Sequence, residues 1–137
     1  MPPRTFESVV FGEELPELRA DVSLGRVQRF ATAVGMAGNP RFTEHEGARR
    51  QGLPGAIVPG IMSQALLASL IHVWAPGAQI RTIDTVFRAP VLVDSKPVCR
   101  GVVTHLDAPQ RSVEIDLTIV NEAGETRVLG TAVVRLA

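Results

Sequence analysis

The chain has 137 residues, the size of one domain, and residues 1–137 are expected to form a single domain around one core. Lys and Arg number 14, as do Asp and Glu, and aromatic residues are scarce, so neither a nucleic-acid-binding surface nor a polybasic membrane patch is predicted. The single cysteine, Cys99, excludes an internal disulfide and a cysteine-based zinc site, and the first residues lack the apolar stretch of a signal peptide. We therefore expect a cytoplasmic protein whose partner is a small molecule or another protein.

The first part of the chain indicates an extended segment followed by a surface helix. Residues 6–22 form a short entry segment and then an extended or edge piece that ends at residues 20–22. Ser23 can cap a helix with one apolar face, and Gly35 ends it. The predicted apolar face consists of Val27, Phe30, Ala31 and Val34.

A loop over residues 36–42 precedes a second, short helix. Thr43 followed three residues later by Glu46 fits a capping box, which predicts that this helix begins after Thr43. Arg49 and Arg50 suit the negative end of the helix dipole, and Gly52 suits the position just after the helix.

The apolar stretch 57–74 is the element around which we expect the rest of the chain to be organised. It carries no acid, Lys or Arg and is apolar nearly all round, which is typical of a buried helix. Pro59 suits the first turn, Gly60 allows a backbone or a ligand to approach closely, and the Pro-Gly pair at 76–77 ends the run. The sequence therefore predicts a central helix from Gly60 to Trp74, about 20 Å long and too short to span a membrane.

After residue 77 the apolar residues recur at every second position, which predicts β-strands. Four strands are expected at 79–88, 97–106, 112–120 and 126–136, joined by short turns into an antiparallel meander. One buried helix followed by this meander predicts an α+β hot-dog fold, in which a curved antiparallel sheet wraps around a long central helix. Because such a domain leaves a strand edge open and one side of the helix poorly covered, two domains are expected to pair.

The spacing of several motifs resembles the MaoC-like dehydratases, the family of (R)-specific enoyl-CoA hydratases. Phe87-Arg88-Ala89-Pro90-Val91 followed by Asp94 is similar to that family's Phe-x-x-Pro-Val strand end and Gly-Asp turn, although the turn glycine is missing. The resemblance implies the hot-dog fold and, as ligand, an acyl thioester of coenzyme A or of a carrier protein in fatty acid metabolism, with no cofactor and no metal. The other residues that carry it are Asn39-Pro40, Ala48, Gly52 and Ile57-Val58-Pro59-Gly60-Ile61-Met62.

The catalytic element of that family is Asp-x-Asn-Pro-x-His, whose Asp and His hold a water and exchange protons with the acyl chain. The resemblance places the aspartate position on Ala37 and the histidine position on Phe42, while Asn39 and Pro40 are kept. The family's histidine before the helix glycine falls on Pro59. Because neither Ala nor Phe can transfer a proton, the resemblance implies a degenerate catalytic pair, and no catalytic residue is assigned.

The binding half of the family site is retained. In the family the backbone N–H groups at the start of the central helix receive the thioester carbonyl oxygen, and Gly60 keeps the matching position. Free N–H groups and the positive end of a helix dipole favour such an oxygen, and a buried apolar helix suits an acyl chain. The candidate substrate-binding residues are Asn39, Pro59, Gly60 and Ile61. Close packing where the chain turns into the helix explains Gly60 about equally well.

The other chemistry-bearing side chains have simpler explanations. Residues 44–46, Glu-His-Glu, offer substitute proton-transfer groups, but neighbours on a helix point in different directions, and a solvated helix start is the simpler explanation. His72 and His105 lack metal-ligand spacing. Ser63 and Ser69 have no predicted base within reach, so a bond to their own helix backbone, or packing, is expected. Four arginines could meet the phosphates of coenzyme A: Arg41, Arg49, Arg50 and Arg88.

Three functions follow from the sequence as hypotheses. The favoured one is a non-catalytic hot-dog subunit that binds an acyl thioester while a related chain supplies the Asp and His, in a homodimer or a heterodimer. The second is an active hydratase or dehydratase that uses other residues, with Glu44 or His45 as candidates. The third is a protein that binds an apolar small molecule without chemistry.

Overall fold

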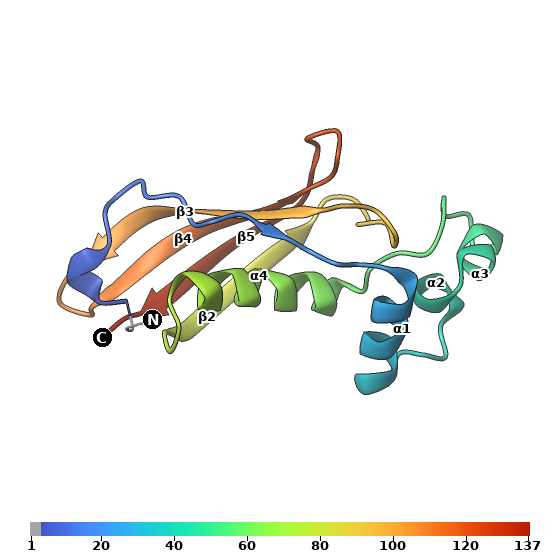
Figure 1. The fold of residues 1–137 in the computed structure, drawn as a ribbon, viewed down its shortest axis with the longest axis horizontal. Coiled ribbons are helices and arrows are strands. Elements are labelled where there is room, and N and C mark those ends of the chain that lie inside the picture. Colours follow the sequence, from blue (N-terminus) through green and yellow to red (C-terminus); the bar gives the residue numbers. More distant parts are fainter. Residues whose placement is uncertain (1–3) are drawn as a thin grey trace.

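The computed structural model describes residues 4–137. Its strands are β1 (Leu18–Arg19), β2 (Gln79–Phe87), β3 (Val98–Asp107), β4 (Ser112–Val120) and β5 (Thr126–Arg135). Its helices are the 3₁₀ turn η1 (Phe6–Ser8), α1 (Leu24–Ala33), α2 (Pro40–Thr43), α3 (His45–Arg50) and α4 (Gly60–Trp74). The sheet lies over α4, and α1, α2 and α3 form a separate group beyond the end at which α4 begins (Figure 1).

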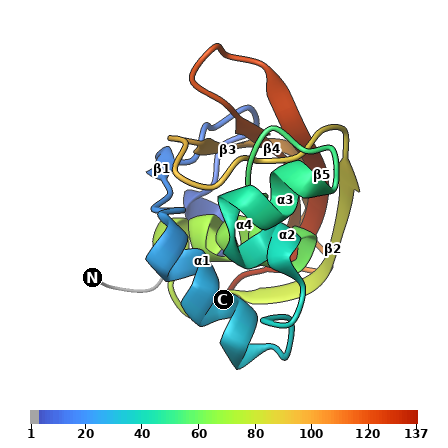
Figure 2. The ribbon, with the colours of Figure 1, turned by 90° about the vertical axis from the view of Figure 1, so that its right-hand side faces the viewer.

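The strands form one antiparallel sheet in the order β1-β3-β4-β5-β2, which curls around α4 (Figure 2). This is the predicted hot-dog arrangement, and the four predicted strands lie within one residue of their expected bounds at every end. The alternation in β4 is confirmed, because the predicted inner side chains are buried. The extended piece expected before residue 22 contains only the two-residue edge strand β1.

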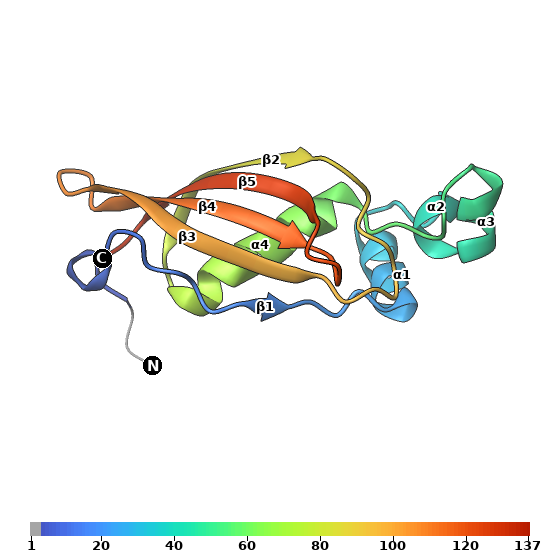
Figure 3. The ribbon, with the colours of Figure 1, turned by 90° about the horizontal axis from the view of Figure 1, so that it is seen from above.

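The central helix α4 has the predicted bounds, Gly60 to Trp74. One side of it packs against the inner face of the sheet (Figure 3), where Leu67, Leu70 and Ile71 are completely buried. The opposite side is exposed: Ile61 is 54% and Val73 63% exposed, and Ala65, Ser69 and His72 lie on the same side. The burial predicted from the apolar composition is therefore confirmed for only one side of the helix in the single chain. None of the described helices is long and apolar enough to cross a membrane.

The C-terminal end of α4 is fastened to the N-terminal segment. The indole N–H of Trp74 donates to Glu13 Oε2 at 2.9 Å. Arg4 pairs with the same carboxylate and lies over the Trp74 ring, 4.9 Å from its centroid. The segment before β1 thus closes the end of the core that lies farthest from α1–α3.

The capping box predicted at Thr43 is wrong. Thr43 is the last residue of α2, and Glu44 is the N-cap of α3 with no side-chain capping bond. The helical turn begins earlier because Pro40 occupies its first position and the Asn39 side chain accepts from the backbone N–H of Arg41 at 3.1 Å. The predicted end of the helix is confirmed, since Gly52 follows the C-cap with φ +87°.

The apolar face predicted for α1 is confirmed at Val27 and Ala31, which are fully buried. Phe30 is only partly buried, and Val34 is 41% exposed because it lies just past the last helical residue, at the C-cap. Ser23 occupies the predicted N-cap position, but its side chain makes no capping bond.

Cys99 in β3 is completely buried, and burial raises the pKa of its thiol to about 12. Because the thiolate is the reactive form, we expect the native protein to react very slowly with an aromatic disulfide reagent near neutral pH. One thiol per chain should become reactive after unfolding in guanidinium chloride, measured by absorbance. Reaction of the native protein at the rate of a free cysteine would contradict the buried placement.

Candidate functional site

A cleft of about 400 Å³ opens at the N-terminal end of α4. Its walls come from α2, the segment before α4, the first turn of α4, the end of β2 with the loop that follows it, and β5. This volume is in the range of small-molecule sites, and most of the lining is apolar. The lining residues are Phe42, Ile57, Val58, Gly60, Ser63, Phe87, Arg88, Ala89, Pro90, Val91 and Val128.

The first turn of α4 presents free hydrogen-bond donors at this cleft. The carbonyl of Pro59, the N-cap, accepts from the N–H groups of Met62 and Ser63 at 2.9 and 3.1 Å. The N–H groups of Gly60 and Ile61 have no acceptor among residues 4–137. No acidic residue lies in the first turn, so the positive end of the helix dipole is not offset there by a side chain of α4. The helix start can therefore accommodate an oxygen with partial negative charge.

Gly60 is also a position of close packing. A β-carbon at this residue would lie 3.1 Å from Cζ of the Phe87 ring. Phe87 is the last residue of the edge strand β2 and is 52% exposed, so its ring covers the start of α4 from the solvent side. The packing explanation of Gly60 therefore has direct support, and its role in ligand binding stays a prediction.

The residues at the family's catalytic positions lie in different surroundings. Phe42 lines the cleft and is partly buried, whereas Ala37 is exposed in the turn before α2 and is not part of the lining. The Asn39 side chain is used as the N-cap of α2. Of the four predicted binding residues, only Gly60 lines the cleft, and Pro59 contributes as the N-cap of α4. The side chain of Ile61 belongs to the exposed side of α4.

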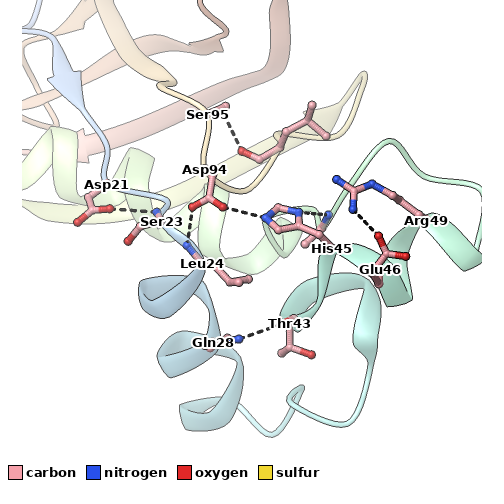
Figure 4. A network of polar contacts seen from close by, with 12 residues as sticks. Asp21, Ser23, Leu24, Gln28, Thr43, His45, Glu46, Arg49, Asp94 and Ser95 are labelled. Carbon is pink, nitrogen blue, oxygen red and sulfur yellow. Dashed lines mark hydrogen bonds and ion pairs between the residues drawn. The ribbon is translucent and has the colours of Figure 1, made fainter.

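His45 belongs to a structural network beside the cleft (Figure 4). Its Nδ1 accepts from the backbone N–H of Ala56 at 3.1 Å, which leaves the proton on Nε2, 2.8 Å from Asp94 Oδ2. The other oxygen of Asp94 accepts from the backbone N–H of Leu24 at 2.9 Å and so supplies the cap of α1 that Ser23 does not. Both ring nitrogens of His45 are therefore engaged, and His45 ties α3 and the segment before α4 to the loop that holds Asp94.

No local sequence pattern predicts this network, because 49 positions separate His45 from Asp94. Asp94 has φ +67°, a left-handed conformation that Asp adopts more readily than most residues. The hydrogen bonds from His45 and from the Leu24 N–H hold the pKa of Asp94 below its usual range.

Of the other candidate histidines, serines and arginines, only two line the cleft. His72 and His105 are exposed, and no group of His, Cys, Asp and Glu in residues 4–137 is arranged to hold a metal ion. Arg41 bonds to Gln51, and Arg49 to Glu46. The two that line the cleft are Arg88 and Ser63.

No family model and no curated protein matches the sequence. Among solved structures, the chain is similar to the (R)-hydratase PhaJ1 of Pseudomonas aeruginosa in its unliganded form, with TM-score 0.89 and 21% identity over 98% of this chain and 86% of that one. It is similar to a chain of the ChsH1-ChsH2 complex from Mycobacterium tuberculosis, with TM-score 0.84 and 20% identity over 93% of this chain and 98% of that one. A MaoC-like dehydratase matches with TM-score 0.89 and 26% identity over 98% of this chain but only 43% of its own length. The predicted resemblance to MaoC-like dehydratases and (R)-hydratases is thus confirmed at the level of the fold.

We expect His45→Ala to lower the free energy of unfolding by about 1–3 kcal/mol, because two hydrogen bonds of ordinary strength are lost and the Ala56 N–H keeps no partner. Urea denaturation followed by circular dichroism measures the change. His72→Ala is the matched control, since that ring is exposed and bonds only to the Ala78 carbonyl. Equal stability of the two variants would contradict a structural role for His45.

The same network predicts that the stability of the folded protein depends on pH. Because the pKa of Asp94 is lowered in the folded state, folding favours its ionised form. This contribution to stability is complete at neutral pH and is lost as the pH falls below the ordinary pKa of aspartate and through the lowered one. The stability difference between the wild type and Asp94→Asn should therefore shrink over that acidic range, and a constant difference would exclude this linkage.

Proposed function

We propose that this chain is a MaoC-like hot-dog subunit that binds an acyl thioester in the cleft at the start of α4 and lacks a proton-transfer pair of its own. The observation that carries the proposal is the composition of the cleft. Phe42 stands in it at the position that the resemblance assigns to histidine, and no acid and no histidine is among the lining residues.

Hydration of an enoyl thioester requires one group that removes a proton from water and one that delivers a proton to the acyl chain. The apolar lining of the cleft contains no such pair, and its one charged residue, Arg88, is a hydrogen-bond donor only. The substitute candidates have less support: Glu44 is an exposed N-cap, and both ring nitrogens of His45 are engaged in the Asp94 network. The cleft is suited to binding an acyl thioester, because the free N–H groups of Gly60 and Ile61 can donate to the thioester carbonyl and the apolar walls can contact the acyl chain.

We expect the missing Asp and His to come from a catalytic partner of related fold. Apart from His72, the exposed side of α4 carries apolar or small residues, and β2 is an edge strand that pairs only with β5 within the described chain. Both features favour association with a second hot-dog subunit, either another copy or a related chain that keeps the Asp and His. The similarity to a chain from the ChsH1-ChsH2 complex supports pairing between different chains.

The purified chain alone is expected not to hydrate crotonyl-CoA; the assay measures the loss of absorbance of the conjugated thioester. The same chain is expected to bind butyryl-CoA in calorimetry. Activity is expected only when a MaoC-like chain with an intact Asp and His is added. Turnover by this chain alone would contradict the proposal that it lacks a proton-transfer pair. If Glu44→Gln and His45→Ala then abolished that turnover, an active hydratase that uses these residues would replace the non-catalytic subunit as the proposed function. Absence of butyryl-CoA binding would contradict the thioester site.

Association through α4 gives a second prediction. The purified chain should have at least twice its monomer mass of 14.7 kDa by light scattering. Val73→Glu places a charge on the exposed side of α4 and should shift the mass toward the monomer. The matched control is Val10→Glu, because Val10 is 65% exposed but lies in the segment before β1. A wild-type monomer, or equal effects of both substitutions, would argue against this interface.

A further inference from the structure

The Ser63 hydroxyl is a buried polar group that the fold of residues 4–137 does not use. Ser63 is 2% exposed, lines the cleft, and makes no side-chain hydrogen bond with any described residue. A serine in a helix commonly bonds to the carbonyl four positions earlier, as Thr32 does to Gln28 at 2.9 Å. The corresponding carbonyl, that of Pro59, instead accepts two backbone N–H groups, from Met62 and Ser63. The expected bond of Ser63 to its own helix is therefore absent.

The Ser63 hydroxyl is not among the fully enclosed side-chain atoms that lack a partner in the described residues, so it is reached from the cleft, where a bound ligand can replace water as its hydrogen-bond partner. Ser63 lies three positions after Gly60, so both residues face the same side of α4. At 1.5 Å per residue the two are separated by roughly 4.5 Å along the helix. The cleft thus contains two kinds of hydrogen-bond donor. The free N–H groups lie at the start of α4, and the Ser63 hydroxyl lies about one turn further along the helix, among apolar walls.

We propose that Ser63 determines specificity in this cleft by donating a hydrogen bond to an oxygen on the acyl chain of the bound thioester. This inference rests on the proposed function, which places the thioester carbonyl at the N–H groups of Gly60 and Ile61. An oxygen on the third carbon of the acyl chain lies a few ångströms from that carbonyl, as Ser63 lies a few ångströms beyond Gly60. The cleft therefore prefers 3-hydroxyacyl thioesters to the corresponding saturated ones, because only the former satisfy the hydroxyl of Ser63.

Calorimetric titration of the purified full chain with 3-hydroxybutyryl-CoA and with butyryl-CoA tests the inference. Ser63→Ala should weaken binding of the hydroxylated ligand about 3- to 10-fold, the value of one ordinary hydrogen bond, and leave butyryl-CoA binding within about 2-fold. Ser63→Thr keeps the hydroxyl and should keep the preference. Ser69→Ala, an exposed serine on the same helix, is the control and should change neither affinity.

Thermal unfolding of the ligand-free variants separates this role from a structural one. Removal of an unpaired hydroxyl should leave the melting temperature of Ser63→Ala equal to or above that of the wild type, whereas removal of a structural hydrogen bond would lower it. Equal losses for the two ligands, or no loss for either, would overturn the role of Ser63 and leave the thioester site standing. Failure of the wild type to bind either ligand would overturn the proposed function and this inference with it.

Discussion

The burial of one side of α4 against the inner face of the sheet is the interaction on which the rest of the structure depends. Full burial of a Leu or Ile side chain contributes about 1.5–3 kcal/mol, whereas an ordinary hydrogen bond contributes about 0.5–1.5 kcal/mol. Leu67, Leu70 and Ile71 are all completely buried, so this contact fixes where the helix lies under the sheet. It also fixes where the helix begins, and with it the place at which the N–H groups of Gly60 and Ile61 meet the end of β2.

The region around the cleft is held in a different way. There the elements are short, and side chains that bond to backbone groups replace extensive apolar packing. Asn39 caps α2, Asp94 caps α1, and His45 links Asp94 to Ala56, which is itself followed by cleft residues. Asn39 and His45, which the sequence suggests as binding or catalytic residues, thus make structural hydrogen bonds instead. The apolar character of the cleft follows from this arrangement, because its polar neighbours are directed toward one another.

The sequence predicts the regular elements well and the polar details poorly. The Gly and Pro residues that bracket residues 60–74, and the alternation in residues 112–120, each depend on local chemistry, and both predictions are confirmed. The capping box failed because Pro40 and Asn39 start a helical turn ahead of Thr43, a competition between two local signals. The pairing of His45 with Asp94 depends on tertiary structure alone. For Ser63 the sequence shows a serine on an apolar helix, but only the structure shows that the Pro59 carbonyl is already occupied.

The strand order has a consequence for the way the chain acquires its structure during synthesis. β2 precedes β3 and β4 in the sequence, yet its partner is β5, which follows both, so that Ile83 pairs with Ala132. Such distant contacts cost loop-closure entropy before they contribute stability. On the ribosome, α4 and β2 are made before the other three long strands, and the sheet that covers α4 cannot close until residues 126–135 are available. While the rest of the chain is being made, the nascent chain therefore carries an incompletely covered apolar helix and an unpaired strand, a state in which chaperones or a second hot-dog chain would find a ready binding surface.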